Sequence, residues 1–452
     1  MGMNRVKKLF TVIVIFLFFG IVFFPSSGIQ IDNKPIIQSS RGNTLYVGGS
    51  GPNNYTKIQD AIDDASDGDT VFVYDDSSPY YENIEIDKSI NLVGENKNTT
   101  ILYGVGNYYY HIDVFTDWIK ISRFTIQNGR TGINLRSNYN LITDNIIIFH
   151  SNYGINLKGS NNTITENTLS ENNFSAIYLH YSSNNVIKEN IISNGFHGIY
   201  LVNSNNNVIM DNNFSKNKGG LDLHSYNYNN VITSNSFFKN DRGICITDSM
   251  RNTIIYNNLS KNKYSIELRR SCINTISYNN VNSSEHDGIA ILDNSDCNTI
   301  NFNSVNNSTW VGLFFSDSKK NILNNNRIIL NKHGIFINGN KNTISGNLIY
   351  SYERIGILVS GCSNIIISNN ICSDEGDGIH LWYNSSNILI RNNFLFNQKE
   401  PFFYNCKNIW FMNYWNESRS LPKIINGEIK VFEKWIPWFN FDWFPARQPY
   451  DI

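Results

Sequence analysis

The sequence predicts an all-β protein folded as a parallel β-solenoid, in which successive coils of the chain stack on one another. Three observations predict this fold class. An Asn-Xaa-Ile signal recurs along the chain, a second asparagine follows three residues after the Ile, and a Gly-Ile-Xaa-Leu signal closes each unit. The second asparagines follow one another at steps of 21 to 24 residues. A repeat of this length is typical of proteins whose units are stable only when stacked.

The second asparagine of each unit is expected to form a polar ladder along the solenoid. These positions are Asn145, Asn167, Asn190, Asn212, Asn235, Asn257, Asn279, Asn303, Asn326, Asn347, Asn369, Asn392 and Asn413. They fall where the chain must turn, and asparagine tolerates the left-handed backbone conformation better than any residue but glycine. Coils stacked at about 4.8 Å would let the amides hydrogen-bond to one another.

Short strands are expected between these turns. The segments hold two to five residues with alternating apolarity, which is too short for a helix and suits strands. Each coil of about 22 residues would hold three strands and three turns. One predicted inward row is Ile164, Ile187, Ile209, Ile232, Ile254, Ile276 and Ile300. The other is Ile147, Leu169, Ile192, Phe214, Phe237, Leu259, Val281, Val305, Ile328, Ile349 and Ile371.

The start of the chain has the features of an export signal. Residues 1–28 place basic side chains before an apolar run over residues 9–24, followed by a small-residue exit. We expect a signal peptide, and the alternative is an uncleaved membrane anchor through residues 9–24. Either reading places the protein outside the cytoplasmic membrane, extracellular or at the cell surface. Residues 29–43 are expected to be a linker.

The remaining chain divides into a cap, the repeats and a second cap. Residues 44–112 should form the N-terminal cap and first coils, with one helix that begins at a capping box of Thr56 and Gln59. Its apolar stripe is Ile58, Ala61, Ile62 and Ala65. Residues 113–413 should form the β-helix repeats. Residues 414–452 lose the repeat and are rich in aromatic residues, which predicts a C-terminal cap or, alternatively, a partner-docking surface.

These features together resemble a known family. The stretch TLYVGGSGPNNYTKIQDAIDDASDGDTVFV, the following YYENIEIDKSINLVGENKNTTI and the Asn-rich coils are similar to right-handed parallel β-helix proteins of the pectin-lyase-like superfamily. Within it they most resemble the NosD-like family, named for a periplasmic copper-binding protein, and the carbohydrate-binding and sugar-hydrolysis repeat domain. The resemblance covers residues 44–413. It implies a right-handed, single-stranded β-helix, but the fold is shared by binding proteins, lyases, hydrolases and surface proteins.

Composition limits the partners. Lys and Arg number 37 and Asp and Glu 38, so the net charge of −1 does not indicate nucleic acid or an anionic membrane surface. The repeat runs without a linker, so we expect one elongated domain and a monomer. The leading expectation is a protein that binds extracellular polysaccharide or serves a structural role at the surface. The alternatives are a polysaccharide lyase or glycoside hydrolase and, second, a NosD-type copper accessory protein.

Any chemistry should come from outward-facing rows on the strand that begins at each Gly-Ile. One row holds Asn134, Asn156, Tyr178, Tyr200, Asp222, Cys245, Glu267, Ala290, Phe314, Phe336, Leu358 and His380. A parallel row, two residues further along, holds Arg136, Lys158, His180, Val202, His224, Thr247, Arg269, Leu292, Ser316, Asn338, Ser360 and Trp382. The predicted ligand-binding residues are Tyr178, His180, His197, Tyr200, Asp222, His224, Glu267 and Arg269. Aromatic rings can stack on sugar faces, and polar groups can fix sugar hydroxyls.

A catalytic version of this site rests on two carboxylates. Asp222 and Glu267 occupy the same row two coils apart, which separates their backbones by about 9.6 Å, near the upper carboxylate spacing of inverting glycosidases. His224 and Arg269 lie alongside. The competing interpretation is a solvated surface acid at each position. We favour that interpretation because no compact acidic or arginine cluster of the pectin-degrading enzymes is evident, and we lean towards a protein without enzymatic activity.

Metal binding and disulfides receive little support from the sequence. The eight histidines are dispersed and the methionines form no motif, so we expect neither a metal site nor a cofactor. Six cysteines in an exported chain permit disulfides. Cys272 and Cys297 occupy nearly equal registers in adjacent coils, which predicts a disulfide between them.

Overall fold

The computed structural model describes residues 42–106, 108–382, 385–399 and 401–452. The predicted signal peptide or anchor, with its apolar run over residues 9–24, lies outside the described residues, as does nearly all of the predicted linker. Within the described part of the chain, no helix is both long and apolar enough to span a membrane.

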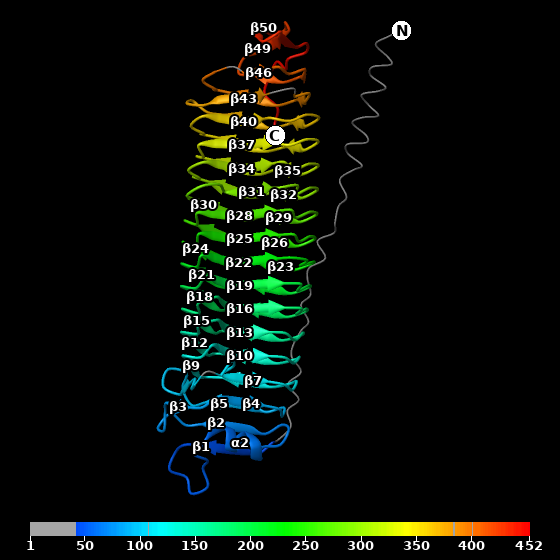
Figure 1. Ribbon diagram of the computed structural model, residues 1–452. Helices are drawn as coiled ribbons and strands as arrows, with labels where there is room; N and C mark the ends of the chain where they lie inside the picture. Colours follow the sequence, from blue (N-terminus) through cyan, green and yellow to red (C-terminus); the bar gives the residue numbers. More distant parts are fainter. Residues whose placement is uncertain (1–41, 107, 383–384, 400) are drawn as a thin grey trace. The chain divides into compact units, whose positions relative to one another are not determined.

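The described chain winds into a stack of coils whose strands form three lengthwise faces, as Figure 1 shows. The first face, in front in Figure 1, consists of β4 (Ile84–Ile86), β7 (Ile112–Val114), β10 (Thr131–Leu135), β13 (Tyr153–Leu157), β16 (Ser175–His180), β19 (His197–Val202), β22 (Gly219–His224), β25 (Arg242–Thr247), β28 (Tyr264–Arg269), β31 (Ile289–Leu292), β34 (Val311–Ser316), β37 (His333–Asn338), β40 (Ile355–Val359), β43 (Asp377–Trp382) and β46 (Phe402–Tyr404). Each strand pairs in parallel with its equivalent in the next coil.

The other two faces consist mostly of three-residue strands. The second face holds β1 (Thr44–Val47), β2 (Thr70–Val73), β5 (Asn91–Gly94), β8 (Lys120–Ser122), β11 (Leu141–Thr143), β14 (Thr163–Thr165), β17 (Val186–Lys188), β20 (Val208–Met210), β23 (Val231–Thr233), β26 (Thr253–Ile255), β29 (Thr275–Ser277), β32 (Thr299–Asn301), β35 (Ile322–Asn324), β38 (Thr343–Ser345), β41 (Ile365–Ile367), β44 (Ile388–Ile390) and β47 (Ile409–Phe411). The third holds β3 (Tyr80–Tyr81), β6 (Ile101–Tyr103), β9 (Thr125–Gln127), β12 (Ile146–Ile148), β15 (Thr168–Ser170), β18 (Ile191–Ser193), β21 (Asn213–Ser215), β24 (Ser236–Phe238), β27 (Asn258–Ser260), β30 (Asn280–Asn282), β33 (Ser304–Asn306), β36 (Arg327–Ile329), β39 (Leu348–Tyr350), β42 (Asn370–Cys372), β45 (Asn393–Leu395) and β48 (Tyr414–Trp415).

The apolar core consists of the inward rows that the sequence predicts. Ile187 pairs in register with Ile209 and Ile192 with Phe214, and all four side chains are buried. The same holds for the other members of both rows. Because each side chain rests on its equivalent in the next coil, the core is continuous along the stack, and the predicted β-solenoid is confirmed.

The predicted asparagine ladder is also confirmed. Asn190 is typical: its Nδ2 donates to Oδ1 of Asn212 at 3.0 Å and to the carbonyl of Ile164 in the preceding coil at 2.9 Å. Its backbone N–H donates to the same Oδ1 at 3.0 Å. Each ladder amide therefore joins its own coil to both neighbours. The first asparagine of each unit forms a second ladder, as between Asn185 and Asn207 at 3.0 Å.

The turn conformation differs in one detail from the prediction. The ladder asparagines themselves do not adopt positive φ; the residue before each of them does, for example Glu189 (φ 56°) before Asn190 and Asp211 (φ 56°) before Asn212. The left-handed residue turns the chain, and the next residue can then direct its amide inward to bond along the stack. Glu189 and Asp211 are not buried, whereas the asparagines are.

The N-terminal end is closed by helix α2 (Ile58–Asp64), whose predicted apolar stripe is buried. The predicted capping box is wrong, because Lys57 occupies the N-cap position and no N-cap side chain bonds to the helix. Instead the Glu82 carboxylate accepts the N–H groups of Ile58 at 2.9 Å and Gln59 at 3.1 Å. A carboxylate supplies two charged acceptors at the positive end of the helix, which a threonine hydroxyl cannot do.

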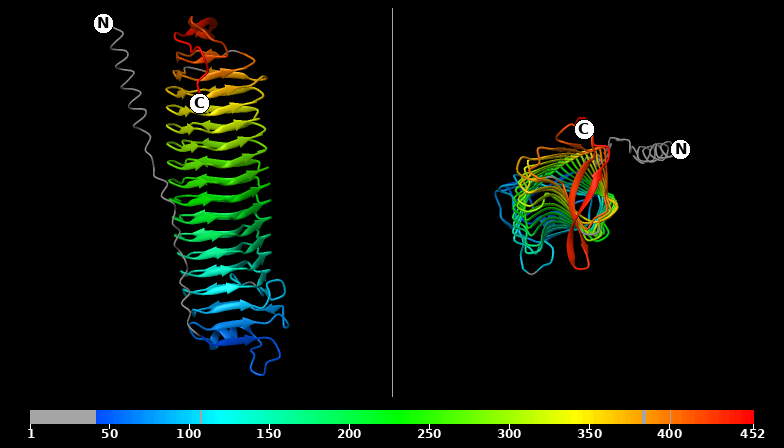
Figure 2. Two further views of the ribbon diagram at one scale, coloured as in Figure 1. Left: turned by 180° about the vertical axis from the view of Figure 1, so that it is seen from behind. Right: turned by 90° about the horizontal axis from the view of Figure 1, so that it is seen from above.

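The C-terminal end is closed by the antiparallel hairpin of β49 (Lys423–Val431) and β50 (Lys434–Asp442). The axial view in Figure 2 shows this red hairpin crossing the end of the stack. At its final residue, the buried Asp442 carboxylate accepts hydrogen bonds from the backbone N–H and Nδ2 of Asn413, at 2.9 and 3.1 Å. The ladder therefore ends on a carboxylate, which needs no further acceptor.

Two buried histidines lie inside the early coils. His150 lies two residues after β12, at the position that Asn172, Asn217 and Asn240 occupy in later coils, and its ring Nδ1 lies 3.0 Å from Oδ1 of Asn172. Burial lowers the pKa of His150 to about 4. Burial, with a contribution from His150, lowers the pKa of His111 to about 3. The two rings are 6.3 Å apart.

We expect these histidines to make the fold sensitive to acid. The unfolded chain takes up a proton near pH 6.5, whereas folded His150 remains neutral down to about pH 4. The contribution of neutral His150 to the free energy of unfolding is therefore fully present above pH 6.5 and decreases as the pH falls towards 4. His150→Asn, which introduces the residue that later coils have at this position, should recover about 3 kcal/mol of the loss between pH 7 and 4, measured by denaturant unfolding. His286→Asn, at a half-buried histidine whose ring contacts the Asp287 carboxylate, is the control, and an unchanged pH profile in His150→Asn would contradict the expectation.

Candidate ligand-binding face

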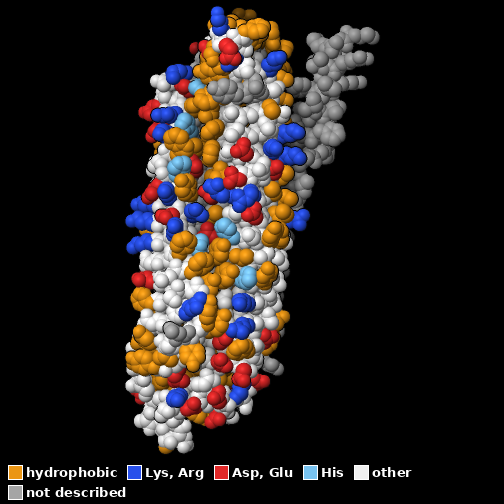
Figure 3. Space-filling view, viewed as in Figure 1, with side chains coloured by type: hydrophobic (Ala, Val, Ile, Leu, Met, Phe, Trp, Pro, Cys, Tyr) orange, Lys and Arg blue, Asp and Glu red, His pale blue; other side chains and the backbone are white. Residues whose placement is uncertain are grey.

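The predicted outward rows lie on the first face, in the register expected from the sequence. Tyr178 pairs with Tyr200, Tyr200 with Asp222, Asp222 with Cys245, and Cys245 with Glu267. In the second row, His180 and His224 flank Val202, and Arg269 follows Thr247. Figure 3 shows apolar and histidine side chains gathered over the middle of this face.

The two carboxylates of this face are not solvated surface acids. The side chain of Asp222 is 1% exposed and that of Glu267 is 5% exposed. Each carboxylate is bonded to a neighbouring side chain, and Cys245, itself buried, lies between them in the row. Burial raises the pKa of the Cys245 thiol to about 12, so the thiol is neutral at physiological pH.

Asp222 forms a close pair with His197 from the preceding coil. His197 Nδ1 lies 2.6 Å from Asp222 Oδ2, and the His197 side chain is 14% exposed. Gly219 makes room for the pair, because a Cβ at that position would lie 1.9 Å from Asp222 Oδ2. When Nδ1–H donates to the carboxylate, Nε2 carries the free lone pair. The pair can therefore present an oriented imidazole to a ligand.

Aromatic rings extend from this pair along the face. Tyr200 stacks on His197 with ring centroids 4.6 Å apart and on Tyr178 at 5.7 Å, and Tyr178 stacks on Tyr153 at 4.7 Å. Because the rings lie face to face along the stack, they cover much of one another's faces. Burial raises the pKa of Tyr178 to about 12, and burial together with the charge of Asp222 raises that of Tyr200. Both phenols remain protonated and can donate hydrogen bonds.

The two remaining predicted histidines border this group. The ring of His180 lies 5.7 Å from that of Tyr178, and the ring of His224 lies 5.5 Å from that of Tyr200. Burial lowers the pKa of each histidine, an effect that nearby Asp222 partly offsets for His224. Both rings are therefore neutral at physiological pH. We call Tyr178, His180, His197, Tyr200, Asp222 and His224 the tyrosine–histidine patch.

Glu267 and Arg269 form a separate ionic group further along the face. Arg269 Nε donates to Glu267 Oε1 at 2.6 Å, and its Nη1 donates to Asp293 Oδ2 at 2.9 Å. The first hydrogen bond, to Glu267, makes the largest contribution to raising the pKa of Arg269. The sequence placed Glu267 and Arg269 with the patch, but their side chains are committed to one another and to Asp293.

Sequence reasoning missed two aromatic residues at the edge of the patch. Tyr153 extends the ring stack, and Phe174 contacts His197 and Tyr200 at centroid distances of 5.5 and 6.0 Å. Both residues precede the Gly-Ile signal or its Ala-Ile equivalent by one or two positions. A search of the two positions before the Gly-Ile signal in every unit, in addition to the outward rows, would have identified both residues.

The structure does not contain the predicted disulfide. All six cysteines are free. The Sγ of Cys272 lies 3.4 Å from the backbone nitrogen of Asp296, one residue before Cys297. A shift of one residue in a solenoid turn sends the two side chains in different directions, so nearly equal register is insufficient for a disulfide.

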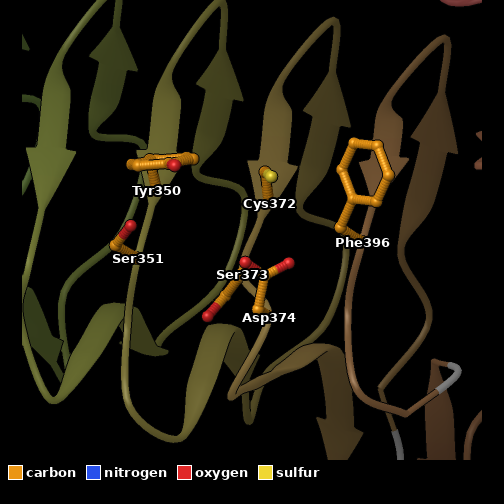
Figure 4. A pocket seen from close by; sticks show the side chains of 6 residues that line it. All are labelled: Tyr350, Ser351, Cys372, Ser373, Asp374 and Phe396. Carbon is orange, nitrogen blue, oxygen red and sulfur yellow. The ribbon is translucent and has the colours of Figure 1, made fainter.

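Outside the patch, a shallow open pocket lies on the third face (Figure 4). Tyr350, Cys372 and Phe396 border it on successive coils, with Ser373 and Asp374 below them in Figure 4. None of the predicted site residues lines it. No group of three or more potential metal-ligating side chains is present within the described ranges.

Comparison with known proteins identifies the family. Residues 111–259 and 242–395 match the model of the right-handed β-helix region. The chain belongs to this family. The match also agrees with the right-handed coil that the sequence resemblance implied. No protein in the curated set matches the chain.

Solved structures resemble this β-helix at low sequence identity. A mannuronic acid specific polysaccharide family 6 lyase from human gut microbiota is 12% identical, with a TM-score of 0.49 over 74% of this chain and 87% of that one. The Dettilon tailspike protein is 16% identical, with a TM-score of 0.48 over 68% of this chain and 66% of the tailspike. The Azotobacter vinelandii mannuronan C-5 epimerase module is 13% identical, with a TM-score of 0.41 over 71% and 91%. At these values the likeness concerns the fold alone.

Proposed function

We propose that this β-helix binds an extracellular polysaccharide through the tyrosine–histidine patch. The proposal rests on the hydroxyl groups of two tyrosines in this patch. Within the described residues, the hydroxyls of Tyr178 and Tyr200 have no hydrogen-bond partner, although both residues are half-buried beside the His197–Asp222 pair. Polar groups fixed on a rigid face and lacking partners suit the hydroxyls of a sugar.

The structure changes how the rings would contribute. The sequence suggested that ring faces would stack on sugars, but these faces are occupied by neighbouring rings. Recognition would instead come from the outer edges: phenol hydroxyls, the His197 imidazole and the His224 imidazole. Stacking fixes the orientation of each ring, so little side-chain entropy would be lost when a glycan binds.

Removing the two hydroxyls should weaken glycan binding without disturbing the fold. We expect Tyr178→Phe/Tyr200→Phe to retain the ring stack and to lose about tenfold in affinity, since a typical hydrogen bond contributes about 0.5–1.5 kcal/mol. Glycan-array screening followed by calorimetry on the best ligand measures the loss. Tyr256→Phe, at an exposed tyrosine on another corner of the coil, is the matched control. Equal affinity in the double variant, or no glycan bound by the wild type, would refute the proposal.

The second candidate function is a polysaccharide lyase, favoured by the His197–Asp222 pair. A histidine held by a buried carboxylate can act as a general base, with Asp222 as a positioning residue. This arrangement fits the geometry better than an inverting Asp222–Glu267 pair, because both carboxylates are buried and already bonded. A product-release assay on the same ligands tests it. Cleavage that is lost in His197→Ala would assign catalysis, and binding without cleavage would leave the binding protein.

We further propose that the protein acts outside the cytoplasmic membrane, as the export signal predicted over residues 1–28 implies. A structural role at the cell surface is compatible with the same rod. N-terminal sequencing of the protein from its native host would establish whether the signal is removed.

A further inference from the structure

Three lysines form a column along one corner of the rod. Lys216, Lys239 and Lys261 follow the third-face strands of three consecutive coils, and all three are exposed. The backbone N–H of Lys216 donates to Phe238 O at 3.2 Å and that of Lys239 to Ser260 O at 3.2 Å, which places the lysines at equivalent positions. Figure 3 shows several blue side chains one above another at the left edge of the molecule, near the middle of the stack.

This column has no local counter-charge. Within the described residues, none of the three ammonium groups lies within ion-pair distance of a carboxylate, although nine ion pairs between lysine or arginine and a carboxylate occur elsewhere in that part of the chain. Coils are about 4.8 Å apart, and like charges at equivalent positions on adjacent strands destabilise a sheet. The three ammonium groups therefore repel one another, and a bound anionic ligand would reduce this repulsion.

A second set of basic residues extends the column toward the tyrosine–histidine patch. Lys218, Arg242 and Lys263 lie at the entrances of β22, β25 and β28 and are exposed, with Asp241 as the one acid among them. The chain reaches Asp222 of the patch only four residues after Lys218. The corner and the patch therefore form neighbouring parts of one surface.

Aromatic rings lie between these cations. The ammonium of Lys218 lies 4.6 Å from the ring centroid of Phe196, and that of Lys239 lies 5.2 Å from that of Phe238. Both rings are exposed. Exposed rings beside unpaired ammonium groups offer apolar contact for a sugar ring together with a charge for a substituent on it.

We infer that the lysine column binds a polyanionic glycan, one that carries carboxylate or sulfate groups along its length. The inference rests on the proposed function and narrows its ligand to acidic polysaccharides. A nucleic acid fits less well, because the column covers only three coils and the net charge of the chain is −1. A linear acidic glycan would lie along the rod, with its charges on the column and its hydroxyls on the patch.

The test uses matched neutral and anionic polymers. Carboxymethyl cellulose is compared with hydroxyethyl cellulose, and dextran sulfate with dextran, by affinity electrophoresis and by titration at several salt concentrations. We expect the wild type to prefer one or both anionic polymers at least tenfold. Preference for carboxymethyl cellulose alone would assign carboxylate recognition, and preference for dextran sulfate alone would assign sulfate recognition.

Lys216→Gln/Lys239→Gln/Lys261→Gln should abolish that preference and reduce the slope of log affinity against log salt by roughly three, since about one counterion is released per neutralised charge. The control is Lys319→Gln/Lys320→Gln/Lys341→Gln, which removes the same charge from three other exposed lysines and should bind as the wild type does. The inference fails if the first variant keeps the preference or if both variants lose it equally. It also fails if poly-dT binds to the column as tightly as the anionic polymers do.

The tyrosine variants separate this inference from the proposed function. If Tyr178→Phe/Tyr200→Phe binds the anionic polymers normally but the lysine variant does not, the column is a glycan site and the patch is not. If the tyrosine variant loses binding and the lysine variant does not, the patch stands and the column is refuted.

Discussion

Asn212→Ala is expected to destabilise the fold by about 3–5 kcal/mol. The amide accepts hydrogen bonds from the backbone N–H and Nδ2 of Asn190, both at 3.0 Å. It donates to the carbonyls of Ile187 and Met210 and to Oδ1 of Asn235, at 2.8, 2.9 and 3.1 Å. Alanine would remove all five of these hydrogen bonds and would leave the backbone N–H of Asn190 without its acceptor at a position that is 1% exposed. Denaturant unfolding followed by circular dichroism measures the loss.

The adjacent Asn213 provides a matched control. It is exposed at the start of β21, and its side chain makes no hydrogen bond within the described residues. Asn213→Ala should therefore change stability by less than about 0.5 kcal/mol. Similar losses in the two variants would show that the ladder amides contribute no more than any surface asparagine.

Asp442→Ala should produce a second large effect, at the C-terminal end. In addition to the two bonds from Asn413, the carboxylate accepts the N–H groups of Met412, Trp415 (Nε1) and Phe444, at 3.0, 3.1 and 3.3 Å. Four buried or partly buried donors would lose their acceptor, and Asn413 Nδ2 would keep only its bond to the Leu389 carbonyl, so we expect a loss of about 3–5 kcal/mol. The hairpin β49–β50 should also become susceptible to proteolysis. Unfolding curves and limited proteolysis measure the two effects.

Two further variants serve as comparisons for Asp442→Ala. Asp442→Asn retains one acceptor oxygen and should lose less stability than the alanine variant. Asp451→Ala removes an exposed carboxylate near the C-terminus and should have no measurable effect. If Asp442→Ala behaves like Asp451→Ala, the hairpin is held by apolar contacts alone and the carboxylate does not terminate the ladder.

The repeated part of the fold was predictable because the same local residue pattern recurs in every coil. An inward Ile, a ladder Asn and a closing Gly recur with one period, so register follows from sequence once the coils are known to stack. The predictions that were wrong concern features that depend on contacts between different coils or on side-chain direction. Glu82 caps helix α2 from 24 residues away, and a one-residue offset prevents the Cys272–Cys297 disulfide.

The candidate site was predictable only as rows. Sequence placed Tyr178, Tyr200 and Asp222 on one line along the rod, and their register in the structure agrees. The sequence could not predict how deeply each side chain is buried. Asp222 is buried because Gly219 lacks a side chain and His197 covers the carboxylate, and neither relation follows from alternation along a strand.

The sequence by itself determined that this chain is a β-solenoid, which residues form its core, and which residues share each outward row. These properties follow from period and polarity, which are local. Only the tertiary structure decided which outward side chains form pairs: Asp222 pairs with His197 and Glu267 with Arg269, whereas Lys216, Lys239 and Lys261 have no carboxylate partner among the described residues. The physical reason is that pairing depends on the reach and orientation of side chains from different coils, which a one-dimensional period does not contain.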